Sequence, residues 1–130
     1  MKLDCDCVRD TLLALETMGF NESLRIPQLA KKPQLAGYTE DEIHYTCLKL
    51  LEAGYIAANA IPIGAVLGIV DVTDITYPGH EFLNTIREDK NWRKVKSAAK
   101  AAGVFSLKGL AETGIKVASA MIEAALEGNL

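Results

Sequence analysis

The sequence contains few of the residues on which disulfide-rich and metal-binding proteins depend. Its 130 residues include three cysteines and two histidines, and aromatic residues make up 6% of the chain. A disulfide framework needs an even set of cysteines and an oxidising compartment. Three cysteines are an odd number, and in a chain that we expect to be cytoplasmic they predict reduced thiols and no disulfide framework.

Long apolar segments are also absent. A membrane-spanning helix needs about 18 or more consecutive apolar residues, and no run of that length in this chain is apolar throughout, because Asn59 and Pro62 interrupt the uncharged residues 53–70. A secretory signal needs an apolar run after its basic start, but Asp4 and Asp6 interrupt such a run here. We expect neither a signal peptide nor binding to a membrane.

Catalytic signatures are scarce as well. No serine occupies the Gly-x-Ser-x-Gly turn of hydrolases, and no glycine-rich loop is spaced to hold phosphates. His80 and Glu81 are adjacent, and neighbours on a helix point about 100° apart, so they do not form an acid–base pair. We expect His80 to be a structural hydrogen-bonding residue and His44 to stand alone on an exposed face. The sequence predicts a protein that is not an enzyme and that has no catalytic or cofactor site.

Cys5 and Cys7, flanked by Asp4 and Asp6, form the cluster that invites metal or redox chemistry. The first turn of a helix lowers the pKa of a thiol, whereas adjacent carboxylates raise it. Structural zinc takes four ligands, and the chain contains no second closely spaced pair of cysteines. We expect Cys5 to pack inward and Cys7 to lie near the surface, with no metal bound. A metal or redox site that adds a histidine is a third hypothesis for function, after the two developed below.

The chain does contain enough apolar residues for one core. Hydrophobic residues make up 49% and charged residues 24% of the sequence, which suits a globular chain of this length. The net charge of −3 is divided unevenly, because residues 1–88 carry 7 basic and 13 acidic residues whereas residues 89–130 carry 7 and 4. We predict a core domain over residues 1–88 and a helical extension over residues 89–130, packed on the core or on a partner.

Apolar spacing, capping residues and chain breakers predict the order of the elements. Asp4 can cap a first helix, and residues 39–42 (Thr-Glu-Asp-Glu) have the capping-box pattern that begins the third. The inward face of that third helix is expected to carry Ile43, Cys47, Leu50 and Leu51. Helices are expected over residues 5–18, 27–32, from 39 to the stop at Gly54, after Thr76, over 91–102 and over 106–127. Strands are expected over residues 24–26, 55–61 and 69–75, with a turn marked by Pro62, Gly64 and Gly68.

This order predicts an α+β, mostly helical fold. A three-helix core whose third helix leads into a β-hairpin is a winged helix-turn-helix, and here a C-terminal helical extension follows it. Residues 50–56 (Leu-Leu-Glu-Ala-Gly-Tyr-Ile) resemble the third helix and second strand of bacterial winged-helix regulators. The usual pattern in those regulators is Leu-x-x-Leu-x-x-Ala-Gly-Leu-Ile/Val.

Longer motifs resemble a narrower group. The most specific is residues 75–83 (Ile-Thr-Tyr-Pro-Gly-His-Glu-Phe-Leu), followed by the single Trp92. The accompanying motifs are residues 7–10 (Cys-Val-Arg-Asp) with 12–13 (Leu-Leu), 38–43 (Tyr-Thr-Glu-Asp-Glu-Ile), 51–54 (Leu-Glu-Ala-Gly), 87–89 (Arg-Glu-Asp), 94–96 (Lys-Val-Lys), Gly103 and 105–107 (Phe-Ser-Leu).

With these motifs the chain resembles an uncharacterised family of small phage- and prophage-associated bacterial proteins, a domain of unknown function with a winged-helix-like core. The resemblance implies an architecture, a bacterial host cell and a link to mobile elements, but no reaction. Residues 75–77 stand where the family usually has Leu-Thr-Trp, and residues 44–47 also depart slightly from it. Gly79, His80 and Phe82 are its candidate structural residues, and Gly79 indicates a close approach of the backbone to a neighbouring element.

The predicted recognition helix is poorly suited to DNA. In helix-turn-helix proteins the start of that helix meets bases or phosphates, and here residues 40–42 are all acidic. Lys49 is the one basic residue of the helix, and the expected wing, residues 61–70, contains no lysine or arginine. Affinity for DNA comes mainly from basic residues that neutralise phosphates, so the usual DNA-binding face lacks its positive charge.

Basic residues gather after the core instead. They are either a patch that binds nucleic acid or an acidic partner, or a solvated helix face that complements the acidic core, and we favour the solvated face. The candidate residues of this patch are Lys90, Trp92, Arg93, Lys94, Lys96 and Lys100.

The last expected helix carries an apolar stripe at helical spacing. The stripe must cover its own domain, a second copy of the chain or another protein, and winged-helix proteins often dimerise through added terminal helices. A strongly basic polar face, which favours binding at a membrane surface, is missing. The candidate residues for a dimer or partner are Leu107, Leu110, Gly114, Ala118, Met121 and Ile122, followed by Ala125.

Together these features predict a non-catalytic interaction protein that binds a protein partner and itself as a homodimer. The alternative is a DNA-binding transcriptional regulator of phage or prophage origin.

Overall fold

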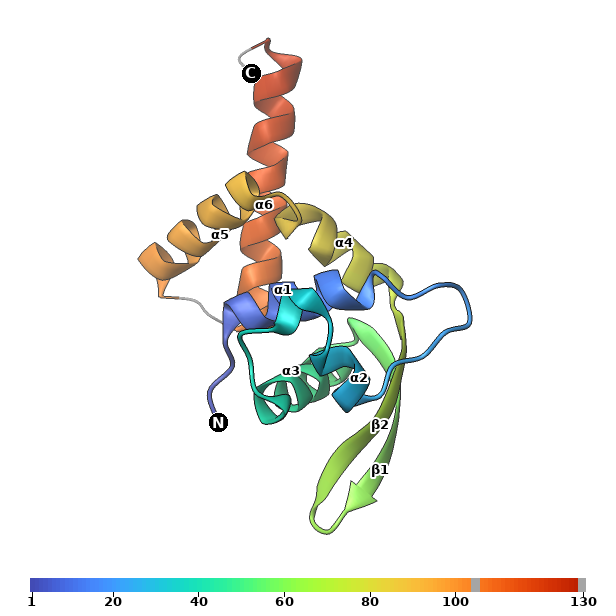
Figure 1. Ribbon diagram of the computed structural model, residues 1–130. Coiled ribbons are helices and arrows are strands. Elements are labelled where there is room, and N and C mark those ends of the chain that lie inside the picture. The colour runs from blue at the N-terminus through green and yellow to red at the C-terminus, as the bar shows by residue number, and fades with distance from the viewer. Residues whose placement is uncertain (104–105, 129–130) are drawn as a thin grey trace. The chain divides into compact units, whose positions relative to one another are not determined.

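A computed structural model describes residues 1–103 and 106–128, so Phe105, one of the residues that carry the family resemblance, lies outside it. The fold is α+β and mostly helical, with a two-stranded antiparallel hairpin (Figure 1), which confirms the predicted class. The chain divides into two compact units, Met1–His80 and Glu81–Leu130. The domain boundary expected at residue 88 stays a prediction.

The elements follow the predicted order, with small shifts at their ends. The first helix ends three residues earlier than expected, and the second begins one residue earlier. The elements are α1 (Cys5–Leu15), α2 (Ile26–Ala30), the short 3₁₀ helix η1 (Pro33–Leu35), α3 (Glu40–Glu52), β1 (Ile56–Ile63), β2 (Val66–Ile75), α4 (Tyr77–Ile86), α5 (Asp89–Ala102) and α6 (Leu107–Leu126).

Side-chain caps begin the two main helices of the first unit. The Asp4 carboxylate accepts hydrogen bonds from the backbone N–H groups of Asp6 and Cys7 at the start of α1. At the start of α3, Thr39 Oγ1 accepts from the Glu42 N–H while the Glu42 carboxylate accepts from the Thr39 N–H, each at 3.1 Å. Reciprocal bonds of this kind satisfy N–H groups that a helix leaves unpaired, and the predicted capping box is confirmed.

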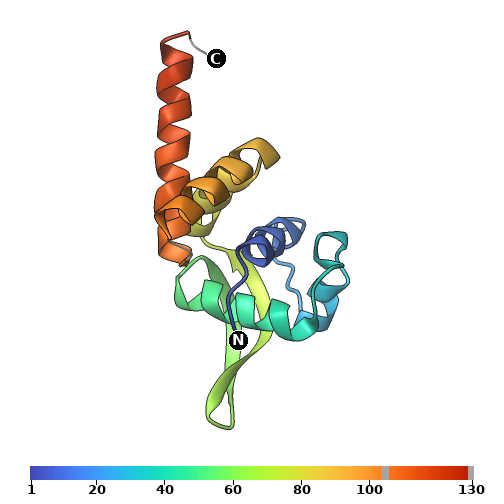
Figure 2. The ribbon, with the colours of Figure 1, turned by 90° about the vertical axis from the view of Figure 1, so that its left-hand side faces the viewer.

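The first unit has its core where α1, α2 and α3 meet the base of the hairpin. Figure 2 shows the two strands extending away from these helices. A two-stranded hairpin has little core of its own, so its base is stabilised by the helices beneath it. The fully or nearly fully buried residues of this core include Val8, Leu12 and Leu15 of α1, Leu29 of α2, Ile43, Cys47 and Leu50 of α3, and Ile56, Val72 and Ile75 of the hairpin.

The hairpin is longer than the sequence predicts, and the turn expected over Pro62, Gly64 and Gly68 is wrong at two of its three residues. Pro62 lies in β1 opposite Leu67, and Gly68 lies in β2 opposite Ile61. Proline is compatible with an edge strand, because its missing N–H faces away from the partner strand. Only Gly64, at φ 63°, has the left-handed backbone of a tight turn.

Short contacts outside the main ladder tie the hairpin to its surroundings. Leu24 forms an isolated bridge with Val72, where the predicted strand over residues 24–26 is reduced to one residue. After the hairpin, Thr76 Oγ1 donates to the Gly54 carbonyl and accepts from the Gly79 N–H, as expected of a cap for α4.

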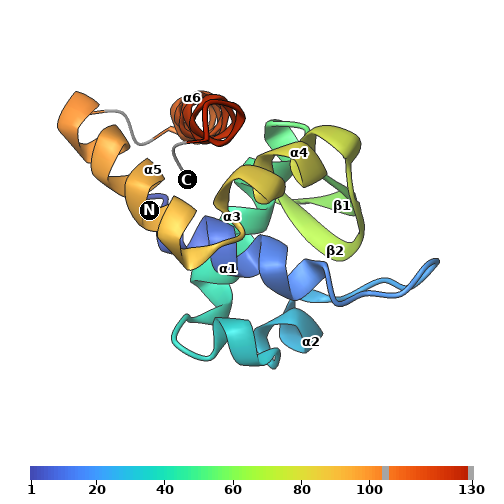
Figure 3. The same cartoon turned by 90° about the horizontal axis from the view of Figure 1, so that it is seen from above.

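The second unit contains the end of α4 together with α5 and α6, and α5 and α6 pack on each other (Figure 3). Gly103 ends α5 in the left-handed conformation, at φ 71°, and Ser106 caps α6 by accepting from the Gly109 N–H. Its buried residues include Phe82, Leu83 and Ile86 of α4, Trp92, Val95 and Ala99 of α5, and Leu107 and Leu110 of α6. Among the described residues, no helix is both long and apolar enough to cross a membrane.

A substitution at Gly79 would test how closely α4 packs against the base of the hairpin. A Cβ at this position would collide with the carbonyl oxygen of Tyr55 and with the side chain of Ile75. We expect Gly79→Ala to lower the free energy of unfolding by about 2 kcal/mol, because overpacking outweighs the roughly 1 kcal/mol that alanine gains over glycine in a helix. Urea denaturation measures the change. The control is Gly37→Ala, where a Cβ meets nothing within 4 Å, and an equal loss in both variants would contradict the explanation.

Candidate functional site

An apolar groove lies between α3 and the hairpin. Its volume is about 670 Å³, and it is an open hollow on the surface of the first unit. Leu51, expected on the buried face of α3, is only partly buried and lines this groove. The lining residues are Met1, Asp41, His44, Tyr45, Leu48, Lys49, Leu51 and Glu52 from the amino terminus and α3, and Ile63, Val66, Leu67 and Gly68 from the hairpin.

The hairpin side of the groove exposes large aliphatic residues. Ile63, Val66 and Leu67 are 56%, 67% and 53% exposed. Ile61 and Val70 on the same hairpin are exposed too. The sequence shows that this segment lacks basic residues, but the exposed apolar tip was missed, since isoleucine and valine in a strand are usually assigned to a core. Clustered exposed apolar residues mark interaction surfaces.

Acidic side chains border the groove on the α3 side. Asp41, exposed in the first turn of α3, and Glu52, exposed at its end, both line the groove. Lys49 is the basic side chain among the lining residues, and its Nζ lies 3.1 Å from Glu52 Oε2 and 5.3 Å from the centre of the Tyr45 ring. Lys49 is thus paired with Glu52, and Asp41 gives the α3 side of the rim its negative charge.

His44 connects α3 to the hairpin, and the expectation that it stands alone on an exposed face is wrong. Its Nε2 accepts a hydrogen bond of 2.9 Å from the backbone N–H of Ile69, and the side chain is partly buried. This bond satisfies a backbone donor on the outer side of β2, where no third strand pairs with it. The sequence could not reveal it, because the two residues are 25 positions apart.

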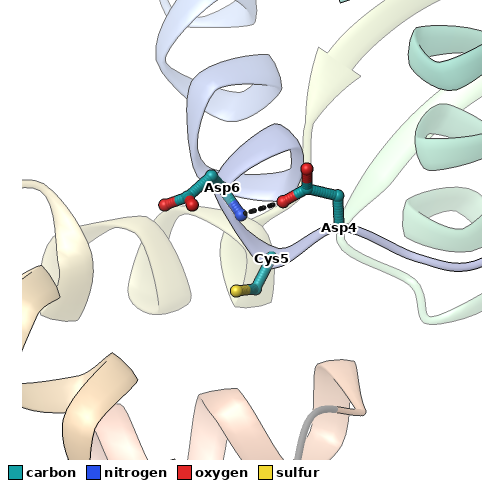
Figure 4. A group of neighbouring side chains, drawn as sticks. All are labelled: Asp4, Cys5 and Asp6. Atoms are coloured by element: carbon teal, nitrogen blue, oxygen red, sulfur yellow. Dashed lines mark hydrogen bonds between the residues drawn. The ribbon is translucent and has the colours of Figure 1, made fainter.

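Asp4, Cys5 and Asp6 lie together at the start of α1, where the Asp4 side chain caps the helix (Figure 4). The possible ligand atoms of the three residues lie within 4.8 Å of one another, yet the Asp4 carboxylate is turned toward the backbone N–H of Asp6 at 2.8 Å. Three ligands of this kind are fewer than structural zinc takes, and exposed carboxylates hold metals weakly without further ligands. The capping bonds account for the position of the Asp4 carboxylate.

The expected orientation of the two neighbouring cysteines is reversed. Cys7 is buried and Cys5 is partly exposed, because the side chain of Cys7 points toward α3, where Thr46 Oγ1 lies 3.3 Å from its Sγ. Burial raises the pKa of the Cys7 thiol, although the hydroxyls of Thr46 and Thr11 act in the opposite direction. Burial also raises the pKa of Cys47, to about 12. Both thiols are therefore protonated near neutral pH.

The three candidate structural residues of the 75–83 motif have different surroundings. Gly79 and Phe82 are buried, and Gly79 is held close to the chain that leaves α3, at the carbonyl of Tyr55, as the motif indicates. His80 is exposed, beside a polar hollow that Asp71 and Asp74 also line. No hydrogen bond of the His80 side chain is found among residues 1–103 and 106–128, so its expected structural role is not supported.

The basic patch of α5 is split between surface and interior. Lys90, Arg93, Lys94 and Lys100 are exposed. Trp92 is buried, which corrects its place among the candidate binding residues, because a buried indole cannot stack on a base or on a partner. Lys96 is partly buried and its Nζ lies 5.7 Å from the centre of the Trp92 ring, within the range of a cation–π contact.

Comparison with known protein families matches residues 2–105 to the family described as hypothetical protein (DUF2513). The chain belongs to the DUF2513 family. The matched region contains all of the groove's lining residues except Met1, both cysteine-bearing helices and the basic residues of α5, and it ends before α6. Searches of curated proteins and of solved structures find no match.

The apolar stripe expected on α6 lies outside the DUF2513 match and divides into two parts. Leu107, Leu110 and Gly114 are buried, and a Cβ at Gly114 would collide with Thr85 of α4. Further along, the stripe leaves the interior, so the helix does not cover its own unit over its whole length. Ala118 and Met121 are partly buried, whereas Ile122 and Ala125 are exposed.

The thiols give a first prediction for the site. Only a thiolate reacts readily with alkylating agents, and burial raises the pKa of Cys7 and of Cys47. With iodoacetamide at about pH 8, we expect Cys5 to be alkylated first in the native protein, with Cys7 and Cys47 protected. Peptide mass spectrometry measures the order. In urea all three should react at similar rates, and rapid alkylation of native Cys7 would contradict the packing described here.

His44 gives a second prediction. Replacing it with alanine removes the acceptor for the Ile69 N–H, and one such bond contributes about 1 kcal/mol. We expect His44→Ala to speed hydrogen exchange at the Ile69 amide by about twofold to tenfold, as measured by NMR. His80→Ala is the matched control, since that exposed imidazole has no such partner among the described residues. Unchanged exchange at Ile69 in His44→Ala would show that the bond does not protect the strand.

Proposed function

We propose that this DUF2513 protein is a non-catalytic protein-binding protein with a winged-helix core. In this proposal the groove between α3 and the hairpin holds an apolar segment of a protein partner that carries basic residues at its margin. The observation that supports it most directly is the chemistry of the groove, which is aliphatic inside and acidic at its rim.

The winged-helix assignment is supported by the order of the elements. Three helices precede a hairpin that follows α3 directly, and the hairpin projects from the side of the first unit (Figures 1 and 2). In winged-helix proteins the third helix and the wing form the surface that faces DNA. In this protein the groove lies on the corresponding surface, between α3 and the hairpin. The charge of the groove therefore bears on whether this surface binds DNA.

Electrostatics argue against DNA at this surface. Phosphates are attracted by lysine and arginine, whereas Asp41 and Glu52 border the groove on its α3 side and Lys49 is paired with Glu52. Exposed Ile63, Val66 and Leu67 would also be placed against a charged backbone that offers them no apolar contact. Both the charge and the polarity of the surface therefore favour a protein over a nucleic acid.

The groove's chemistry defines the kind of partner. An amphipathic segment that lays its apolar side chains in a groove is a common mode of peptide recognition. Lysine or arginine next to those side chains would meet the acidic rim, which speeds association and selects against acidic segments. The proposed partner is thus a protein segment with aliphatic anchors and flanking basic residues.

The setting of this interaction is inferred from the sequence. Resemblance to small phage- and prophage-associated proteins supports a role linked to mobile elements in a bacterial cell. Three free cysteines, two of them buried, suit the reducing cytoplasm. We infer a cytoplasmic protein that acts by binding.

A second candidate is DNA binding by α5. Lys90, Arg93, Lys94 and Lys100 are exposed within eleven residues, and such a cluster can neutralise phosphates without using the winged-helix surface. Trp92 does not contribute to it, because its ring is buried.

Affinity capture from a bacterial lysate tests the protein-binding proposal when three forms of the chain are compared. Leu67→Lys replaces an exposed anchor in the groove, and Val70→Lys places the same charge on an exposed valine of β2 that does not line it. We expect proteins captured by the wild type to be lost with Leu67→Lys, about tenfold or more since one buried leucine contributes roughly 2 kcal/mol, and to be kept with Val70→Lys. Equal capture by the wild type, Leu67→Lys and Val70→Lys would contradict the proposal.

DNA binding is tested with fragmented host and phage DNA at about 50 mM and 200 mM salt. The proposal predicts no retardation in a gel shift at either concentration. Tight binding that weakens steeply with salt, and that Lys94→Glu abolishes, would instead establish α5 as a nucleic-acid surface.

A further inference from the structure

The second half of α6 carries a large apolar face that its own unit leaves exposed. Ile115, Ile122 and Leu126 are 59%, 61% and 83% exposed. Their spacing of i, i+7 and i+11 places them within about 40° of one another around the helix. This face is separate from the one that Leu107 and Leu110 bury, and Figures 1 and 2 show the last turns of α6 continuing past α5.

Charges border this face on one side only. Lys116 and Glu123, both exposed, are seven residues apart and lie on the same flank of the apolar face. The opposite flank carries the small residues Ala118 and Ala125. In paired helices the residues that flank the apolar seam determine the orientation of the partner. A face with charges on one flank and alanines on the other therefore favours one orientation of a partner helix over the other.

Two copies of α6 complement each other when they run antiparallel. With Ile115 opposite Leu126 of a second copy, the whole exposed stretch from 115 to 126 overlaps its counterpart. The charged flank of one helix then faces the charged flank of the other. Lys116 of each copy lies next to Glu123 of the second copy, so the two-fold symmetry forms this contact twice. A parallel pair would place these charges against the alanine flank and form neither contact.

We propose that residues 115–126 of α6 pair antiparallel with the same residues of a second copy of the chain. Ile115, Ile122 and Leu126 form the seam, and Lys116 with Glu123 selects the antiparallel orientation. The alanines on the other flank let the two helices approach closely. The interface lies beyond the DUF2513 match, which ends at residue 105, and it is independent of the groove between α3 and the hairpin.

Sedimentation velocity of the full chain over a range of protein concentrations tests the pairing. We expect a monomer–dimer equilibrium in the wild type. Ile122→Lys should abolish the dimer at every concentration used, because it places a charge in the seam. Ala120→Lys is the matched control, an exposed residue of the same helix that lies away from the seam, and it should leave the dimer intact. Circular dichroism checks that both variants keep their helices.

Exchanging the charges at Lys116 and Glu123 tests whether the two helices run antiparallel. Lys116→Glu and Glu123→Lys should each weaken the dimer by about threefold to tenfold, and the double exchange should restore it. A wild type that is monomeric up to millimolar concentration overturns the proposal. A dimer that survives Ile122→Lys also overturns it, and a dimer that the double exchange fails to restore overturns the antiparallel arrangement. None of these variants alters the groove, so their failure leaves the capture experiment with Leu67→Lys unaffected.

Discussion

The packing of α3 against α1 and the base of the hairpin is the contact on which the first unit depends. Ile43, Cys47 and Leu50 are fully buried on the inward face of α3. Because a helix turns through about 100° per residue, burying that face fixes where the outward residues point. Leu48 and Leu51 are thereby placed beside the hairpin, and the same helix that forms the core also forms one wall of the groove.

The other wall depends on the hairpin being held at its base while its tip stays free. Leu24 pairs with Val72, and His44 accepts a hydrogen bond from Ile69, so the side of β2 that faces the helices is satisfied at two points. Beyond these contacts Val66 and Leu67 extend into solvent. Exposed aliphatic residues on an edge strand invite unwanted pairing. The presence of exposed Val66 and Leu67 at the tip of the hairpin agrees with the proposal that a partner covers them.

Local signals were the part of the fold that could be predicted well. Asp4, Thr39 and Glu42 act within three or four residues of where they stand, so the caps of α1 and α3 follow from sequence spacing. Errors arose where a residue's surroundings come from distant parts of the chain. Cys7 is buried because Thr46 and α3 lie against it, and His44 is engaged because β2 passes beside it. The spacing of apolar residues along one helix predicts neither the burial of Cys7 nor the hydrogen bond of His44.

Propensity, capping and charge are properties of neighbouring residues, so the class of the fold, the order of its elements and the lack of positive charge where α3 begins could be predicted from the amino-acid sequence. The packing of distant segments alone places Ile63, Val66 and Leu67 in exposed positions opposite Leu48 and Leu51. It also decided that the apolar stripe of α6 is buried at Leu110 but open at Ile122. The physical reason is that burial depends on which segments meet in space, and no single helix or strand specifies that meeting.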